Sequence, residues 1–367
     1  MTPRTTGPAW TLAIVTAAAV ASAIASLWLV FDRYPAGEGT GVAVHDAAAT
    51  EQFIDNFIGA SGGAVTVQRP RIPTGVYVRS IEFAGAANVI VSGEIWQRFA
   101  AGQGDSRTPG FRLVEADAPE FTPIYQRDVG DGQVRGWAFS AKLRQHFSYA
   151  RYPFDRQEVS VRLEPAEWVR NAVLVPDFNA YQLNNPLAKP GVAADLVLPG
   201  WDVTGAFFDY RVQSYNTDFG VAAAAEVPQL YFNVALRRQF IGPFISNLLP
   251  VAVTAMMLFG MLLITTKKET QVVKAMDIVR GTAALFVVAS FQHIALRNAL
   301  SSPRVFYFEY FYFTLYVAIL VITLNGILFA ASTGIRLIDF RDNLIPKLAF
   351  WPALLVLLFA TTFWVLY

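Results

Sequence analysis

The chain has 367 residues, of which 54% are hydrophobic and only 16% are charged. Soluble domains usually carry about 25% charged residues, so part of this chain must face lipid. The net charge of +1 gives no support to nucleic-acid binding, and the absence of cysteine excludes disulfides and thiolate metal sites. There is no phosphate-binding glycine loop, nucleophile elbow or spaced histidine motif. The sequence therefore predicts no enzyme, no metal and no cofactor.

Five apolar stretches are candidates for membrane-spanning helices, which need about 20 residues. They are 5–31, 241–264, the shorter 281–296, 310–335 and 348–367. The first is either an uncleaved anchor or a secretory signal. Its apolar core exceeds the usual signal length of about 7–15 residues, which favours the anchor, although small-residue steps after Ala21 leave cleavage open.

Basic residues predict the orientation of these spans. Lysines at 267, 268 and 274 follow the second span, and Arg336, Arg341 and Lys347 lie between the last two. Positively charged loops stay cytoplasmic, so the segment 32–240 is expected outside. This predicts a multi-pass protein of the cell inner (plasma) membrane, with its large domain extracellular or periplasmic.

The segment 32–240 has the pattern of an antiparallel β-sandwich. After a helical piece at 46–58, alternating strands are expected at 75–83, 88–99, 134–147, 158–163, 201–214 and 230–240. Glycine and proline clusters separate them, as in sandwich folds. The expected fold class is a β + α membrane protein with three parts: an anchor or signal at 5–31, a sandwich at 32–240, and a four-helix transmembrane domain at 241–367.

Several motifs then resemble one family. The run Tyr152-Pro153-Phe154-Asp155-Arg156-Gln157 is similar to the aromatic-Pro-Phe-Asp-x-Gln loop of the pentameric ligand-gated ion channels, the Cys-loop receptor superfamily. Both flanking cysteines are absent, as in bacterial members. The run 236–240 resembles the junction before the first pore-domain helix, Leu248-Leu249-Pro250 resembles that helix, and 292–296 resembles the pore helix. The likeness covers about residues 70–367, and the amino-terminal helix departs from it.

The resemblance implies a coupling site where the sandwich meets the membrane. Its loop residues Pro153, Phe154 and Asp155 would lie at the membrane face, with Asp155 paired to Arg238. An ion pair at such an interface is shielded from water more than a surface pair is. The alternative is a tight structural turn at the base of the sandwich.

The resemblance also implies a ligand site between subunits. A hairpin at 214–228 would form one wall and the segment after the loop another. The candidate residues are Glu164, Glu167, Trp168, Tyr215 and Phe219. Aromatic faces and carboxylates attract a cation. The alternative is that these aromatic residues pack the sandwich.

Helical spacing in the third span defines a candidate pore stripe. Steps of four and three from Ala284 reach Val288, Phe291, Ala295 and Asn298, and Asp277 and Arg280 lie one turn inward. Val288 and Phe291 would form a hydrophobic constriction that closes by dewetting. A ring of Arg280 favours anions, although Asp277 opposes it. A helix that is apolar on every face could instead pack in lipid without conduction.

His293 lies inside the same hydrophobic span. Ionisable groups there are costly and often functional, so His293 could sense protons near neutral or mildly acidic pH. The alternative is a neutral imidazole bonded to a neighbouring helix.

Together these features predict a homopentameric ion channel gated by a ligand or by protons. Each subunit would have four identical partners, the lipid bilayer, a small-molecule or proton agonist, and permeant ions. The alternative is a non-conducting membrane sensor, in which the same sandwich signals to a partner; currents in planar bilayers separate the two.

Overall fold

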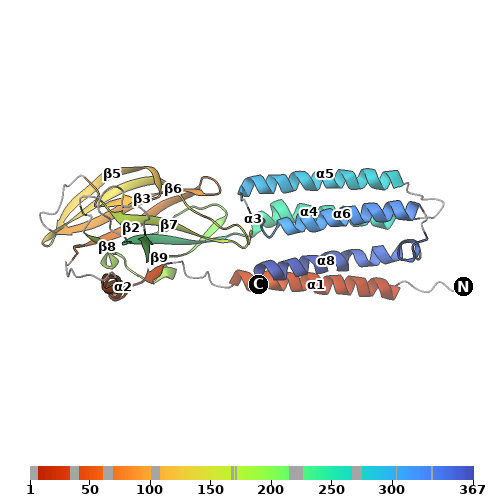
Figure 1. Cartoon of the computed structure of the whole chain (residues 1–367), viewed down its shortest axis with the longest axis horizontal. Coiled ribbons are helices and arrows are strands. Elements are labelled where there is room, and N and C mark those ends of the chain that lie inside the picture. The colour runs from red at the N-terminus through yellow and green to blue at the C-terminus, as the bar shows by residue number, and fades with distance from the viewer. Residues whose placement is uncertain are drawn as a thin grey trace. The chain divides into compact units, whose positions relative to one another are not determined.

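A computed structural model describes residues 7–33, 41–60, 69–100, 108–166, 169, 172–214, 226–266, 275–302, 304–331 and 334–367. The chain forms two compact units (Figure 1). The helical unit comprises Met1–Pro35, Tyr149–Asp155 and Gln239–Tyr367, and the sheet unit comprises Ala36–Ser148 and Arg156–Arg238. The short segment Tyr149–Asp155 thus clusters with the helices, although it lies between two strands in sequence.

The sheet unit contains two five-stranded sheets. One has the order β1 (Val42–Val44), β9 (Trp201–Ser214), β10 (Glu226–Arg238), β7 (Arg156–Pro165), β4 (Phe111–Leu113). The other has the order β5 (Ala116–Val129), β6 (Gly132–Arg144), β3 (Asn88–Ala100), β2 (Arg71–Phe83), β8 (Val173–Pro176). Neighbouring strands are antiparallel except β2 and β8. Helix α2 (Ala47–Ala60) packs Ile54 against Val173 and Val175.

Period-two alternation in the strands produces one shared core. Strand β7 buries Val159, Val161 and Leu163 on one face, while Glu158, Ser160 and Arg162 alternate on the other. The sheets contact each other through the ring of Phe111, 5.7 Å from that of Trp137, and through Tyr210 Oη, which donates to the carbonyl of Leu174 at 2.8 Å. Burial of these apolar faces is the main driving force for the sandwich.

Four strands were not expected from the sequence: β1, β4, β5 and β8. The long strand β5 escaped the pattern because it lies at a sheet edge with mostly exposed side chains. It contains Pro119 and Pro123, and its register to β6 shifts near both. Proline cannot donate to the ladder, so an edge position with bulges is where such a strand forms.

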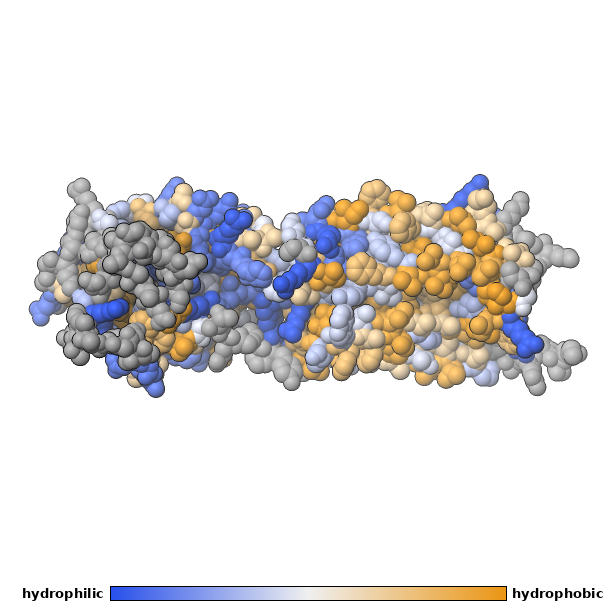
Figure 2. Space-filling view, in the orientation of Figure 1, coloured by the Kyte–Doolittle hydropathy of each residue, from blue (hydrophilic) through white to orange (hydrophobic). Residues whose placement is uncertain are grey.

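Among the described residues, five helices are long and apolar enough to cross a membrane, which indicates a multi-pass membrane protein. They are α1 (Gly7–Arg33), the span Ile241–Ile264 ending in α4 (Leu249–Ile264), α5 (Ala275–Leu300), α6 (Glu309–Ala330) and α8 (Leu344–Leu366). The visible face of the helical unit is largely hydrophobic (Figure 2). Helix α5 is longer than expected because it continues past Arg280 and Arg297, whose charges do not end a helix.

Helix α1 belongs to this bundle rather than standing apart from it. It runs beside α8 in the same direction (Figure 1). Tyr367 Oη donates to the carbonyl of Leu27 at 3.0 Å, and the ring of Phe31 lies 6.1 Å from that of Tyr367. Ile24 is buried, whereas Leu12 and Leu29 are exposed. One face of α1 therefore packs on the bundle and the other is suited to lipid.

Candidate functional site

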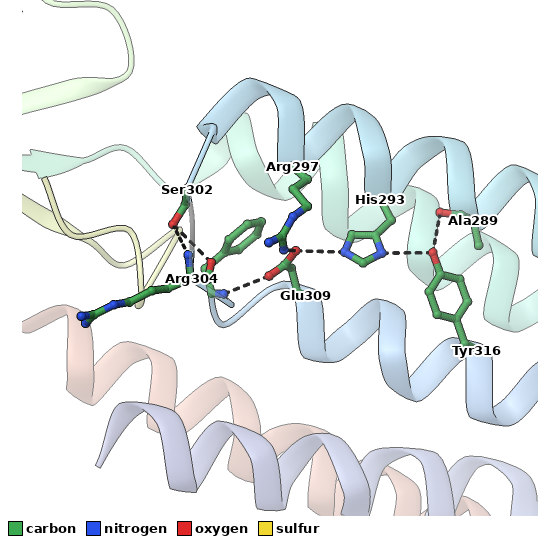
Figure 3. A network of polar contacts seen from close by, with 8 residues as sticks. Ala289, His293, Arg297, Ser302, Arg304, Glu309 and Tyr316 are labelled. Carbon is green, nitrogen blue, oxygen red and sulfur yellow. Dashed lines mark hydrogen bonds and ion pairs between the residues drawn. The ribbon is translucent and has the colours of Figure 1, made fainter. Parts of the chain in front are cut away.

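A fully buried carboxylate begins helix α6. Glu309 is 0% exposed, and its Oε2 accepts a hydrogen bond from the backbone N–H of Phe306 at 3.1 Å. Its Oε1 accepts from the guanidinium of Arg297 and lies 3.1 Å from Nε2 of His293 (Figure 3). A carboxylate in the first turn of a helix is also stabilised by the helix dipole. Glu309 is therefore the centre of a network that links α6 to α5.

His293 is held on both ring nitrogens and both ring faces are enclosed. Nδ1 lies 3.1 Å from Oη of Tyr316. The imidazole stacks on Tyr312 with centroids 4.9 Å apart and meets the edge of Phe313 at 5.6 Å. Its side chain is 15% exposed. The ring is therefore fixed in one orientation, pointing at α6, while its neighbour Ile294 is exposed.

Helical spacing brings these residues together. Ala289, His293 and Arg297 follow one another at steps of four on α5. Glu309 and Tyr316 lie two turns apart on α6. The two helices pack with these faces toward each other (Figure 3), so the residues alternate along the contact. A row of polar side chains thus lies between two helices that are otherwise apolar.

The hydrogen-bond geometry supports two proton arrangements. With Glu309 ionised, its oxygens only accept, so Nε2 of His293 would carry a proton toward Glu309. In the neutral ring, the Tyr316 hydroxyl donates to Nδ1. In the imidazolium, Nδ1 donates to Tyr316, whose hydroxyl then turns to the carbonyl of Ala289, 3.5 Å away. The site can therefore gain one proton without leaving a donor unpaired.

The seven stripe residues predicted on α5 all have exposed side chains in the single chain: Asp277, Arg280, Ala284, Val288, Phe291, Ala295 and Asn298. The opposite side of α5 is buried through Ile278, Thr282, Ala289, Leu296 and Leu300. Phe291 is 69% exposed. At one end, Arg280 Nη1 lies 3.8 Å from Oδ1 of Asp277 on the same exposed face. Among the residues that the structure describes, α5 thus has a packed face and an exposed face that includes the stripe.

The predicted coupling loop lies in the helical unit, within an aromatic cluster. Phe154 stacks on Phe240 with centroids 5.1 Å apart and an interplanar angle of 15°. The indole ring of Trp28 lies 5.8 Å from each of them. Both Phe154 and its neighbour Asp155 are buried, next to Pro153, which is also buried. The loop is therefore held by side chains of the helices that flank it.

Arg238 is the last residue of β10 and belongs to the sheet unit. Its guanidinium lies 4.1 Å from the ring centroid of Trp201, a cation–π contact. Asp155 belongs to the helical unit. The expected Asp155–Arg238 ion pair would join the two units, and it stays a prediction.

Of the predicted ligand residues, only Glu164 lies in the described part of the chain. Glu167, Trp168, Tyr215 and Phe219 lie outside the described residues. The buried carboxylate of Glu164 accepts from Nε of Arg112 at 3.0 Å and from the amide of Gln229. A ligand that used Glu164 would have to displace these bonds, so the sheet favours a structural role for this residue.

The same sheet face carries a second cluster of charged residues, around Arg211. Arg211 lies 2.8 Å from Oε1 of Glu158 and 3.1 Å from Oδ2 of Asp209, over the ring of Tyr231. Burial raises the pKa of Glu158 and of Asp209, and the nearby Arg211 opposes that rise without cancelling it. Both carboxyls therefore take up protons at a higher pH than ordinary carboxyls do.

The sequence did not predict Glu309 and Arg297 as partners of His293. Glu309 was visible only as a charge at the edge of a span. The sequence did contain a signal for this contact. Glu309 is an acidic residue at the start of an apolar helix, and the preceding helix carries His293 with Arg297 four residues later. Trp28 and Tyr307, which contact each other across 279 residues of sequence, gave no signal of this kind.

Searches of known protein families and of curated protein sequences found no match for this chain.

Proposed function

We propose that this chain is the subunit of a homopentameric ion channel, gated by a ligand or by protons, in which α5 lines the pore. The observation that carries the proposal is the exposed stripe of α5, from Asp277 to Asn298, opposite its buried face. The stripe is polar or charged at its ends and apolar at Val288 and Phe291. Rings of such side chains would give two hydrated mouths and a dewetting constriction.

The surfaces of α5 on either side of the stripe favour a ring of several copies over a single chain surrounded by lipid. One flank forms an apolar groove of about 420 Å³ with α4, lined by residues that include Pro250, Val253 and Leu285. The other forms a groove of about 460 Å³ with α6, lined by residues that include Phe286, Tyr316 and Leu320. Two different surfaces on opposite flanks suit head-to-tail contacts, which close into rings. Neighbouring copies would cover the groove with α6 and the α4 side of the other groove, whose stripe residues Ala284 and Val288 would stay at the pore.

The charged residues of the stripe also favour a water-filled pore. Arg280 is 75% exposed in its side chain and Asp277 is 55% exposed. The exposed face of α8, by contrast, carries apolar residues such as Val356, Leu357 and Phe363. Charged groups within membrane spans usually face a protein interior or water rather than lipid. A water-filled pore accommodates Asp277 and Arg280 at its mouth.

Proton gating would act through His293. Protonation places a positive charge between α5 and α6 and reverses the hydrogen bond to Tyr316. Because His293 and the stripe are on the same helix, a change in its bonds to α6 alters the position of the pore-lining face. A ligand or proton then favours whichever arrangement binds it more tightly.

Two measurements test this function. Native mass spectrometry of the purified protein should give a mass five times that of the chain, and planar bilayers containing it should show unitary currents on acidification or on addition of an agonist. A pentamer that stays silent over pH 4–8 and with cationic amines would favour the non-conducting sensor. A monomer would reject the ring altogether.

A further inference from the structure

The end of helix α1 meets two segments that are far away in sequence. One is the loop Tyr149–Asp155, and the other is the connection between α5 and α6, which holds Phe306, Tyr307 and Phe308, all 0–2% exposed. The ring of Phe31 lies 6.3 Å from that of Phe154, and the guanidinium of Arg151 lies 5.2 Å from the ring centroid of Phe31. Helix α1 therefore contacts the loop directly.

Trp28 is the residue of α1 that contacts both segments at once. Its Nε1 donates to Tyr307 Oη at 2.8 Å, and its ring packs against Phe154 and Phe240, 5.8 Å from each. The third ring neighbour is Phe311 of α6, at 6.3 Å. A single side chain thus touches the loop, the α5–α6 connection, the start of the span at 241 and helix α6.

The loop and the connection are bonded to each other beside Trp28. The backbone N–H of Tyr307 donates to the carbonyl of Ala150 at 2.9 Å, and Tyr152 packs its ring against Phe306 and Phe308. The Tyr307 hydroxyl also shares a hydrogen bond of 2.7 Å with Thr362 of α8. Tyr307 is thus a shared partner of α1, α8 and the loop.

We infer that Trp28 is a positioning residue: it holds the loop Tyr149–Asp155 against the α5–α6 connection, so that helix α1 sets how easily the loop moves relative to α5 and α6. The inference rests on the proposed channel function only for its consequence in gating. The indole N–H fixes the orientation of Trp28 through its hydrogen bond to Tyr307, and the indole ring packs against Phe154. In this arrangement α1 positions the loop of each subunit in addition to anchoring the chain in the membrane.

Hydrogen–deuterium exchange on the full-length protein tests this positioning without requiring current. Trp28→Phe keeps an aromatic ring and removes the N–H. The backbone N–H groups of Tyr152, Phe154 and Tyr307, which donate to Tyr149, Arg151 and Ala150, should then exchange about fivefold faster, the effect of losing one hydrogen bond. Trp10→Phe, the same change near the other end of α1, is the matched control and should leave these amides unchanged.

A second variant separates the hydrogen bond from general loosening. In Tyr307→Phe protein the acceptor is already gone, so adding Trp28→Phe should no longer speed exchange of the loop. Unchanged exchange in Trp28→Phe, or an equal change in Trp10→Phe, would overturn the inference, as would an intact mass showing that residues 7–33 are removed from the purified protein. If the wild type carries no current, the channel proposal falls while the exchange data still decide the role of Trp28.

If the channel conducts, the same variants show the consequence for gating. Trp28→Phe should shift the proton or agonist concentration for half-maximal opening by about the same fivefold factor, and Trp10→Phe should not. Conducting channels whose half-maximal concentration is identical in Trp28→Phe and wild type would contradict the claim that α1 influences gating.

Discussion

Nε2 of His293 lies 3.1 Å from Oε1 of Glu309, and this contact joins the carboxyl-terminal half of the proposed pore helix to the start of the next helix. The carboxylate is fully buried, and the imidazole has a second partner, Tyr316, on its other nitrogen. A proton bound or lost at His293 therefore changes the bonds between α5 and α6.

His293→Phe should remove a response to protons, because phenylalanine keeps the ring contacts to Tyr312 and Phe313 but has no ring nitrogen to bind a proton. The measurement is channel activity, or fluorescence of the purified protein, as a function of pH. His146→Phe, at an exposed position in the sheet unit, is the matched control.

A response of the sheet unit to acid should survive that substitution. Burial raises the pKa values of Glu158 and Asp209 above the ordinary values of about 4, so these groups lose their charge before ordinary carboxyls do as the pH falls. A pH response of His293→Phe identical to that of the wild type would return His293 to a structural role.

Glu309→Gln should destabilise the helical unit by about 1–3 kcal/mol, because the buried network loses its negative charge and one of the two oxygens that accept hydrogen bonds. Arg297 is 44% exposed and regains some solvation, which keeps the loss below that of a fully buried pair. The readout is the thermal midpoint in detergent. Asp277→Asn, an equivalent change at an exposed position of α5, should leave the midpoint within a degree or two; equal effects of both would contradict the role of Glu309.

Phe291→Ala and Val288→Ser should each widen and wet the constriction and so produce leak current without stimulus. Phe363→Ala, at a similarly exposed position on α8, is the matched control and should not leak. Silent stripe variants that reach the membrane at normal levels would count against the pore assignment of α5.

Asp155→Ala and Arg238→Ala should each impair gating, and the double variant should cost less than the sum, with a coupling of about 0.5–3 kcal/mol if the pair exists. The cation–π contact between Arg238 and Trp201 is lost in both the single and the double variant, so it cancels in the cycle. Arg237→Ala, whose partner is Asp202, supplies a control cycle with Asp155→Ala that should be additive. Strict additivity in the Arg238 cycle would reject direct pairing.

Arg280→Glu should move the reversal potential in a chloride gradient toward the cation equilibrium potential, because ring charge at a pore mouth sets selectivity. Asp277 should weaken the expected anion preference of the wild type only slightly, since an exposed pair at three-residue spacing contributes about 0.2–0.5 kcal/mol. Arg336→Glu, outside the pore helix, should not shift the potential. A wild type that already selects cations would refute the role given to Arg280.

Hydropathy and alternation in the sequence predicted the five spans and most long strands, because each pattern reports directly on one buried face. Strand β5 was missed because Pro119 and Pro123 interrupt that pattern at a sheet edge. The His293 network was missed for another reason. Its partners lie on a different helix, 16 and 23 residues away, and helix packing rather than local sequence decides which side chains meet.

The role of the amino-terminal helix was the hardest to predict. The apolar length of 5–31 favours an anchor over a signal, but it says nothing about which residues the helix contacts. Trp28 stands among many aromatic residues and its partner Tyr307 is 279 residues away. Only the packed structure reveals that α1 reaches the loop containing Phe154.

The central claim, that α5 of several copies lines an ion pore, is tested most directly by cysteine substitution at Val288. The chain contains no cysteine, so Val288→Cys introduces a single thiol. Unitary currents should be recorded from Val288→Cys in planar bilayers before and after a charged methanethiosulfonate reagent is added to the aqueous phase. A pore lined by Val288 should give currents that the reagent stops irreversibly, with no effect on the wild type. Currents that persist after Val288→Cys has been fully modified, as verified by mass, would contradict it.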